Sequence, residues 1–319
     1  MAYTNDFELS LPMQVWLLQD NYDYDPDPNH LSATSLLKPI RQVILARRAK
    51  KADKLTDISS LLSSAMGTAI HDSLEKAWTN PQRALKLLGH PDKVTQAIKV
   101  NPENPDPNEI NVFLEKRTKK QFNDKWSISG KFDMVLEGRL YDFKTTSVYT
   151  YLKKTKDKDY QLQGSIYRWL NPELIIVPVI NINFLFTDWQ GSMTRTAGYP
   201  QVKAIEYPIP LLSLKETEQY ISNRLALIDR YIDADEKDIP FCTDEELWRG
   251  PTRYKYFSNA AKTDGRATKA FDNAAEAAAH RAEKGKGVVI EVPGAVKACA
   301  YCPAFTVCSQ KDLYEHEGI

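Results

Sequence analysis

Residues 130–144, GKFDMVLEGRLYDFK, decide the fold because they can be paired into a β-hairpin. If the Glu-Gly step at 137–138 is a two-residue turn, residues whose numbers sum to 275 lie opposite one another, and Asp133 faces Asp142. Lys144 lies two residues after Asp142, on the same face of its strand. The sequence therefore predicts two carboxylates and an ammonium group on one patch.

Two carboxylates that face each other across antiparallel strands repel, and this repulsion destabilises the pair. A cation held between Asp133 and Asp142 would remove the repulsion, because carboxylate oxygens are good ligands for divalent cations. The alternative is a solvated polar face on which the charges fall by chance. The hairpin alone leaves both interpretations open.

A helix is expected upstream of the hairpin, over residues 59–78 (SSLLSSAMGTAIHDSLEKAW). Gly67, His71 and Glu75 follow one another at intervals of four and so lie on one face of it. Gly67 allows another backbone to approach closely. Taken alone, His71 is explained as an ordinary surface or core residue. Glu75 is expected to be a surface glutamate, with a carboxylate contact at the metal site as the alternative.

A second helix is expected downstream, over residues 159–170 (DYQLQGSIYRWL). Gln163 and Tyr167 are four residues apart in it and share a face. A pair of this kind usually packs and hydrogen-bonds within the protein. The order of all the features along the chain is more informative than any one of them.

That order is GxxxH, an aspartate on a strand, Asp-x-Lys on the next strand, and QxxxY on the following helix. It resembles the RecB-type branch of the PD-(D/E)XK nuclease superfamily, which includes AddB, the CRISPR adaptation exonuclease and many phage recombination exonucleases. The resemblance spans about residues 57–170, and one departure is Phe132 in place of proline before the first acid. It implies an α/β nuclease-like core, a mixed sheet flanked by helices.

The chemistry expected of such a core is phosphodiester hydrolysis, which needs a cation to neutralise charge on the phosphate oxygens and a water held in line. Asp133 and Asp142 supply oxygen ligands, and the resemblance adds the backbone carbonyl of Phe143 and the imidazole of His71. Lys144 would orient or deprotonate the attacking water. The remaining catalytic residues that the resemblance implies are Gln163 and Tyr167, which would contact the DNA near the scissile phosphate or brace Lys144. Oxygen ligands favour Mg²⁺, and the imidazole makes Mn²⁺ a good substitute.

The expected activity is that of a divalent-metal-dependent DNA exonuclease on single strands or DNA ends in recombination or repair, encoded by a phage or mobile element. Two alternatives stay open: a structure-specific or nicking endonuclease on the same core, and a catalytically silent DNA-binding scaffold. The sequence contains no P-loop, so a built-in helicase motor is not expected. The expected partner is DNA, and a recombination or helicase protein is left open.

All four cysteines lie in the last quarter of the chain, and three of them form CAYCPAFTVC. A chain with no signal peptide and no membrane-spanning apolar run is expected to be cytoplasmic, in a bacterial or phage-infected cell, where a metal site is favoured over disulfides. The resemblance implies a [4Fe-4S] cluster, whereas a Zn²⁺ site of four thiolates is the rival, and free thiols are a third alternative. The residues concerned are Cys242, Cys299, Cys302 and Cys308.

The chain carries 42 basic and 42 acidic residues, so DNA binding has to come from local patches. The segment 147–160, SVYTYLKKTKDKDY, is expected to be a loop in which lysines meet phosphates and tyrosines stack on bases. A solvated lysine loop is the alternative. The candidate DNA-binding residues are Tyr149, Tyr151, Lys153, Lys154 and Lys156. A second basic patch consists of Arg47, Arg48, Lys50, Lys51 and Lys54.

A chain of 319 residues with 42% hydrophobic and 26% charged residues can bury one substantial core and an appendage. We expect a helical and acidic lead-in over 1–56, the nuclease core over 57–239, and a small C-terminal domain over 240–319 stapled by the cysteine-bound metal. The lead-in should contain one helix from Ser32 or Thr34 to about Arg48. The expected strands are 109–121, 126–136, 139–146, 174–187 and 202–209, with helices over 160–170 and 213–234.

Overall fold

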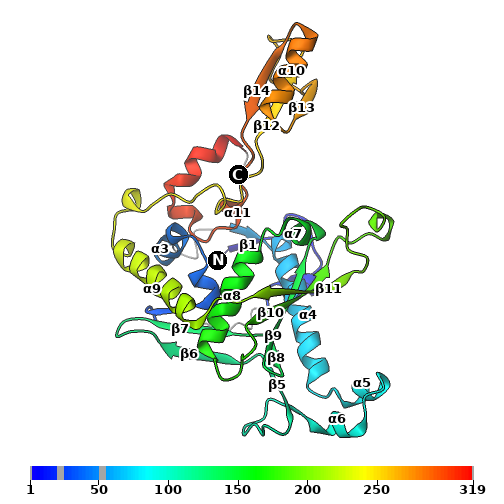
Figure 1. Ribbon diagram of the computed structural model, residues 1–319. Helices are drawn as coiled ribbons and strands as arrows, with labels where there is room; N and C mark the ends of the chain where they lie inside the picture. Colours follow the sequence, from blue (N-terminus) through cyan, green and yellow to red (C-terminus); the bar gives the residue numbers. More distant parts are fainter. Residues whose placement is uncertain (1, 20–24, 50–54, 318–319) are drawn as a thin grey trace. The chain divides into compact units, whose positions relative to one another are not determined.

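The computed structural model describes residues 2–19, 25–49 and 55–317 (Figure 1). The chain forms two compact units, of which the first consists of Met1–Lys38 and Leu55–Ala226 and the second of Pro39–Lys54 and Leu227–Ile319. Both contain mixed or antiparallel sheets with helices beside them, which agrees with the expected α/β class. The domain boundaries drawn from the sequence at 57 and 240 stay a prediction.

The first unit is built on a six-stranded sheet with the strand order β11-β10-β9-β8-β5-β4. The pairs β9–β10 and β4–β5 are parallel and the others are antiparallel. The strands are β4 (Ile98–Val100), β5 (Ile110–Leu114), β8 (Met134–Leu136), β9 (Arg139–Thr146), β10 (Val179–Phe186) and β11 (Ala204–Pro210).

The register of the β8–β9 hairpin is the one predicted from the sequence. Met134 pairs with Tyr141 and Leu136 with Arg139, so opposite residues sum to 275. Glu137 and Gly138 have φ angles of 49° and 74°. Two residues with positive φ form the two-residue turn whose twist matches that of the strands, which fixes the register.

Two expected strands are each broken in two, and the prediction of continuous strands over 109–121 and 126–136 is wrong. Their outer halves, β6 (Arg117–Gln121) and β7 (Ser127–Lys131), leave the large sheet and pair with β2 (His30–Ser32) in a three-stranded sheet. The first of these strands breaks at Glu115, whose φ of 49° bends the backbone, and the second breaks at residues 132–133. Nothing in the hydrophobic pattern marks this bend.

Helices cover the six-stranded sheet (Figure 1). Helix α4 (Leu62–Trp78), preceded by the short helix η2 (Ile58–Leu61), packs on β9, and α8 (Asp157–Leu170) packs on β7, β10 and β11. Trp78 of α4 contributes to an apolar cluster with Val112, Leu114 and Met134 of the sheet. The two helices thereby bring the GxxxH and QxxxY residues to the same sheet.

The other elements of the unit are β1 (Ala2–Thr4), β3 (Leu55–Asp57), α1 (Leu11–Leu17), α2 (Ala33–Leu36), α5 (Gln82–Leu87), α6 (Asp92–Ala97), α7 (Val148–Lys153), η3 (Gly191–Met193) and α9 (Leu214–Tyr231). The last residues of α9 belong to the second unit.

The lead-in helix expected as one piece is two helices, α2 and α3 (Ile40–Arg48). The hydroxyl of Ser32 accepts a hydrogen bond from the amide of Ser35 (3.1 Å) and caps α2, as one of the two expected caps. Pro39 separates the helices, because proline disfavours the helical conformation of the residue before it and cannot donate a backbone hydrogen bond.

The second unit contains a three-stranded antiparallel sheet with the order β13-β12-β14 and one long helix against it. Tyr256, Phe271 and Ala277 form the apolar cluster between the sheet and α10. The elements are α3, η4 (Glu236–Asp238), β12 (Arg253–Phe257), β13 (Lys269–Phe271), α10 (Ala274–Lys284), β14 (Val288–Val292), α11 (Ala298–Tyr301), η5 (Phe305–Val307) and η6 (Ser309–Glu317). Within the described parts of the chain, no helix combines the length and the apolar character that crossing a membrane requires.

Candidate metal centre

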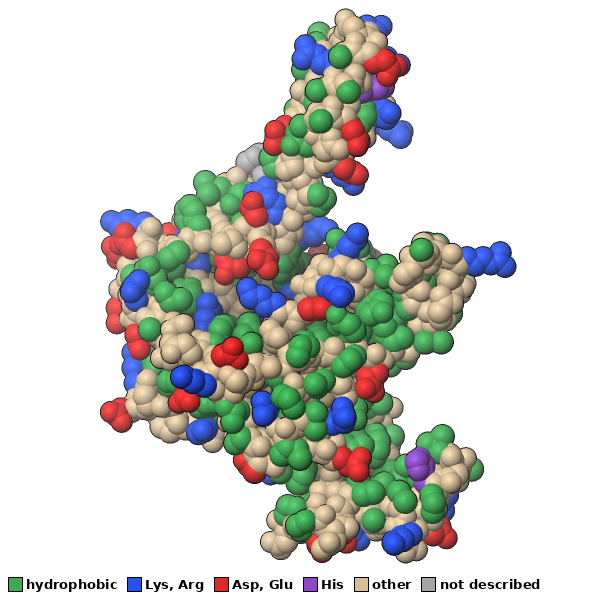
Figure 2. Space-filling model, viewed as in Figure 1, with side chains coloured by type: hydrophobic (Ala, Val, Ile, Leu, Met, Phe, Trp, Pro, Cys, Tyr) green, Lys and Arg blue, Asp and Glu red, His purple; other side chains and the backbone are tan. Residues whose placement is uncertain are grey.

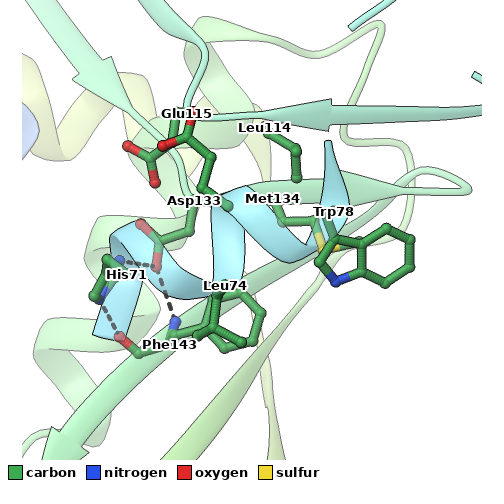
Figure 3. A pocket seen from close by; sticks show the side chains of 9 residues that line it. His71, Leu74, Trp78, Leu114, Glu115, Asp133, Met134 and Phe143 are labelled. Atoms are coloured by element: carbon green, nitrogen blue, oxygen red, sulfur yellow. Dashed lines mark hydrogen bonds and ion pairs between the residues drawn. The ribbon is translucent and has the colours of Figure 1, made fainter. Parts of the chain in front are cut away.

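His71 of α4 lies against the backbone of β9 and against Asp133 (Figure 3). Its Nε2 is 2.8 Å from the carbonyl oxygen of Phe143, and its Nδ1 is 3.4 Å from Oδ2 of Asp133. The same carboxylate oxygen accepts a hydrogen bond from the amide of Phe143 (2.9 Å). At Gly67 a Cβ would lie 3.3 Å from Oγ1 of Thr145, so the glycine permits the close packing of α4 on β9.

Glu115 completes this group, although no sequence motif singles it out. One ligand atom each from His71, Glu115 and Asp133 lies within 4.8 Å of the other two. The Glu115 carboxylate also forms an ion pair with Lys131. The sequence offers only a weak signal for it, the end of the apolar stretch INVFL at a glutamate. Its position follows from the bend between β5 and β6.

Asp142 and Lys144 lie on the face of β9 opposite to the Phe143 side chain, as strand alternation requires. Asp142 is 1% exposed, and its Oδ2 is 2.5 Å from Nζ of Lys144. Apart from this ion pair, neither carboxylate oxygen accepts a hydrogen bond among the described residues. A buried carboxylate with unfilled lone pairs is costly and calls for a further cationic partner.

The pKa of Asp133 also indicates that a cationic partner is missing from this group of carboxylates. Burial, followed by the negative charge of Asp142, raises the pKa of Asp133 to about 8, although the charge of Lys144 opposes the change. Burial alone would lower the pKa of Lys144, but the charges of Asp142 and Asp133 outweigh it and raise that pKa. In the metal-free protein Lys144 therefore keeps its proton, which suits orientation of a water better than its deprotonation.

Gln163 and Tyr167 of α8 are hydrogen-bonded to each other, with the amide nitrogen 2.8 Å from the phenol oxygen. Both are buried, at 9% and 4% exposure. Burial, followed by the charges of Asp142 and Asp133, raises the pKa of Tyr167 well above its ordinary value. The pair thus lies near the carboxylates from the α8 side. Neither side chain has a hydrogen bond to Lys144 among the described residues, and their burial gives them a packing role.

The donor set fits a hard divalent cation. Nε2 of His71 and the carbonyl oxygen of Phe143 are hydrogen-bonded to each other at 2.8 Å, so a cation bound by both atoms would replace the proton between them. The residues around them line a small cavity of about 10 Å³, room for about one water molecule. The lining residues are His71, Leu74, Glu75, Trp78, Leu114, Glu115, Asp133, Met134 and Phe143. A carboxylate-rich centre with one imidazole suits Mg²⁺ or Mn²⁺.

The four cysteines lie within the second unit, where Cys242 and Cys299 belong to one apolar cluster, but among the described residues no three of their sulfur atoms lie within 4.8 Å of one another. Burial, followed by the charges of Glu246, Cys308 and Cys302, raises the pKa of Cys242 to about 12. Burial also raises the pKa of Cys299, followed by Cys302 and Cys308. None of the four thiols forms a disulfide. That they bind a metal, as an iron–sulfur cluster or as zinc, stays a prediction.

Arg41 of α3 is the cation beside these cysteines. Its Nε donates to Sγ of Cys308 (3.2 Å), Nη1 donates to the carbonyl of Ile239 (2.7 Å), and the guanidinium forms an ion pair with Glu236. The side chain is buried at 2% exposure. A buried guanidinium placed on a thiol sulfur stabilises negative charge there.

The expected DNA-binding loop 147–160 is largely helical, and its prediction as a loop is wrong. The hydroxyl of Ser147 caps α7, and α8 begins at Asp157 after a left-handed Lys154 (φ 53°). Tyr149 is 62% exposed, whereas the ring of Tyr151 packs against Phe184, Phe186 and Tyr207. Tyr149 is therefore the ring available to stack on a base.

The lysines of this segment differ in their surroundings. Lys153 and Lys154 are exposed, and the ammonium group of Lys154 lies 6.0 Å from the ring centre of Tyr207. Lys156 forms an ion pair with Asp159 (3.0 Å). In the second basic patch, Arg48 donates to the carbonyls of Ile232 and Ala234 beyond α9. Lys50, Lys51 and Lys54 lie outside the described residues.

No protein-family model matches the chain, and no curated protein matches it. Among solved structures, it is similar to SSO0001, with 14% identity, a TM-score of 0.42, and coverage of 71% of this chain and 89% of the other. It is also similar to a phage-related exonuclease from Haemophilus somnus 129PT, with 16% identity, a TM-score of 0.30, and coverage of 64% and 93%. Scores this low do not establish a shared fold, so the function has to follow from the geometry of the site.

Proposed function

We propose that this protein is a divalent-metal-dependent deoxyribonuclease of the PD-(D/E)XK type, which hydrolyses phosphodiester bonds as an exonuclease on single strands or DNA ends. The observation that supports the proposal most is the convergence of His71, Glu115 and Asp133 beside a buried ion pair of Asp142 and Lys144. Carboxylates, an imidazole and a lysine in this arrangement provide what phosphodiester hydrolysis requires.

The residues that would hold the cation are His71, Glu115, Asp133 and Asp142, together with the carbonyl of Phe143. Bound there, Mg²⁺ or Mn²⁺ would neutralise charge on the phosphate and lower the pKa of a coordinated water. Lys144, kept protonated by its two aspartates, would hold that water by a hydrogen bond and orient it toward phosphorus. The Gln163–Tyr167 pair would support the α8 side of the site.

The second part of the proposal concerns the four cysteines as a structural metal site, either a [4Fe-4S] cluster or Zn²⁺. The placement of Cys242 and Cys299 in one apolar cluster, with the charges of Cys302 and Cys308 acting on both, supports a shared metal rather than four free thiols. The setting we propose is DNA recombination or repair in the cytoplasm of a bacterial or phage-infected cell, with DNA as the partner. A recombination or helicase protein would deliver opened ends.

The deciding experiment compares wild type with Asp142→Asn on linear and circular single-stranded DNA, with Mn²⁺ or with EDTA. We expect wild type to degrade the linear substrate only when Mn²⁺ is present, and the variant to lose at least about a hundredfold in rate, as expected when a group acting in the transition state is removed. Circular dichroism of both proteins reports whether the fold is retained. Equal rates for the folded variant and wild type would refute the proposed role of Asp142, and cleavage of the circle would indicate an endonuclease.

A further inference from the structure

Two segments begin where the parallel strands β9 and β10 end. Lys144 of β9 is paired with Phe184 of β10, and the last pair of the ladder is Thr146 with Phe186. Helix α7 and its flanks follow β9, and the connection to β11, residues 187–203, follows β10. We call this connection the arm. In sheets with parallel strands, ligands bind beyond the carboxyl ends of the strands, which is where both segments lie.

The arm and α7 are joined by Asp188. Its Oδ1 accepts a hydrogen bond from the amide of Val148 at the start of α7 (2.7 Å). One residue earlier, the amide of Thr187 donates to the carbonyl of Thr146 (2.9 Å) and continues the strand ladder. These two bonds fix the base of the arm against the base of α7, so the two segments leave the sheet next to each other.

The arm is held in shape by its own hydrogen bonds, although most of its residues are exposed. The indole of Trp189 donates to the carbonyl of Pro200 (2.9 Å), and the amide of Gln190 donates to the phenol of Tyr199 (2.8 Å). The side chain of Gln201 donates to the carbonyl of Thr194 (2.9 Å). A long connection that is ordered without a core of its own is typical of binding loops.

The charge of the two segments differs from that of the chain as a whole. The chain has equal numbers of basic and acidic residues, whereas 147–156 and the arm together contain five basic residues and one acidic residue, Asp188. Apolar and basic side chains are visible on the arm in Figure 2. The basic residues are Lys153, Lys154, Lys156, Arg195 and Lys203.

Exposed apolar groups accompany these charges. The ring of Tyr149 on α7 is 62% exposed, and on the arm the side chain of Met193 is 42% exposed. Arg195, two residues beyond Met193, is exposed as well. Cations that contact phosphates beside a ring that stacks on a base are the elements of a single-strand binding surface. Duplex DNA would leave the ring unused, because its bases are already stacked.

We propose that α7 and the arm together bind single-stranded DNA, with Tyr149 stacked on an unpaired base and Arg195 on the backbone phosphates. Asp188 is the positioning residue, since it keeps the two halves of the surface in one geometry. This inference rests on the proposed function, because it names the substrate form presented to Lys144. It extends the candidate DNA-binding residues from α7 to a segment that no sequence motif marks.

The test measures binding of a fluorescent oligothymidylate about 20 nucleotides long by anisotropy, in EDTA, so that cleavage plays no part. We expect Arg195→Glu to weaken binding about tenfold at moderate salt and to reduce the slope of log affinity against log salt by about 1. Tyr149→Ala should weaken it by about tenfold, the loss of one stacked base. Arg83→Glu on α5 makes the same charge change elsewhere in the unit and should have less than about a twofold effect.

Asp188→Ala gives the sharpest outcome. It removes a negative charge, so general electrostatics would strengthen DNA binding, whereas loss of the α7–arm connection should weaken it about fivefold. Thermal unfolding of each variant checks that the fold is retained. Tighter binding by Asp188→Ala, or Arg195→Glu and Tyr149→Ala variants that bind like wild type, would overturn the inference even if the protein degrades DNA. If the variants bind as expected but the protein shows no Mn²⁺-dependent cleavage, the inference about single-strand binding stands and the proposed nuclease activity is rejected.

Discussion

The backbone amide of Glu115 donates a hydrogen bond to the carbonyl oxygen of Asp133 over 2.9 Å, and at this rung two neighbouring strands change sheets together. On one side of this hydrogen bond β5 pairs with β8 in the six-stranded sheet, and on the other side β6 pairs with β7 in the three-stranded sheet with β2. The positive φ of Glu115 and the bend at Asp133 turn both carboxylates toward His71. The candidate metal centre is thus a consequence of a backbone bend shared by two strands.

Glu115→Gln should weaken Mn²⁺ binding at least about tenfold, because it removes one negative charge from the ligand set while keeping the size of the side chain. Isothermal titration of the metal-free protein with Mn²⁺ measures this directly. The activity of the variant should recover in part at high Mn²⁺ concentration, since the effect is on affinity for the cation.

Glu75→Gln is the matched control for that substitution. Glu75 also lines the small cavity, but it is exposed and does not belong to the group of ligand atoms within 4.8 Å. We expect Mn²⁺ affinity within about twofold of wild type, as for a surface charge change. If Glu75→Gln lost as much affinity as Glu115→Gln, the assignment of Glu115 rather than Glu75 as a ligand would be incorrect.

Metal binding should become tighter as pH rises toward 8. The pKa of Asp133 is about 8 in the metal-free protein, so below that pH a proton has to leave before the carboxylate can bind a cation. Titrations at pH 6 and pH 8 in buffers with different ionisation enthalpies should show release of about one proton at pH 6 and less at pH 8. Asp133→Asn should abolish the difference.

The raised pKa of Asp133 also determines how the free energy of unfolding of the metal-free protein changes with pH. The folded-state pKa of Asp133 lies above its unfolded value of 3.8, so between about pH 4 and pH 8 the folded protein holds the extra proton. Its free energy of unfolding in EDTA should therefore fall as pH rises through this window. Urea unfolding at pH 5 and pH 8 measures it, and a rise attributable to Asp133 would contradict the burial of its carboxyl group beside Asp142.

The hairpin register could be read from the sequence because a two-residue turn at 137–138 fixes every pair after it. The same holds for the helical faces of His71 and Gln163, since the helix period places them. Glu115 could not be found in this way, because its role depends on a positive φ that no residue type at that position signals.

Two further differences between the predicted and the observed structure have separate physical causes. The break before α3 follows from Pro39, a signal that was present in the sequence but outweighed by the helical pattern around it. The link between Asp188 and α7 joins residues 40 positions apart, and only the folded sheet brings them together. Residues that act through such contacts are invisible to spacing arguments.

Gly130→Ala should destabilise the protein by about 1–3 kcal/mol through overpacking. A Cβ at this position would lie 2.8 Å from the ring of Tyr167 and 2.9 Å from the side chain of Leu170, and all three residues are buried. The ring would have to move, and with it the hydrogen bond to Gln163. Urea unfolding gives the energy, and Mn²⁺-dependent activity reports whether the displaced tyrosine matters to the site.

Gly67→Ala provides the comparison. Its Cβ would lie 3.3 Å from Oγ1 of Thr145, a tight contact, but alanine is favoured over glycine within a helix by about 1 kcal/mol. The two effects oppose each other, so a net change below about 1 kcal/mol is expected. A larger loss for Gly67→Ala than for Gly130→Ala would mean that α4 packs on β9 more closely than its contact with Thr145 implies.

Replacing Arg41 with methionine should destabilise the second unit by about 1–3 kcal/mol, because it leaves the carbonyl of Ile239 without its buried donor and the carboxylate of Glu236 with only its hydrogen bonds from Ser309. It also removes the hydrogen bond to Sγ of Cys308, so if the cysteines hold a metal as proposed, that metal should be lost faster to a chelator than in wild type. Metal analysis and visible absorbance identify that metal: a brown protein contains an iron–sulfur cluster, and a colourless one that releases zinc contains the alternative. The double variant Arg41→Met with Glu236→Gln separates the two roles. It should recover part of the stability, since the carboxylate that lost its cationic partner is replaced by a neutral amide, while the rate of metal loss stays high. If restored stability also restored metal retention, Arg41 would act on the cysteines only through packing.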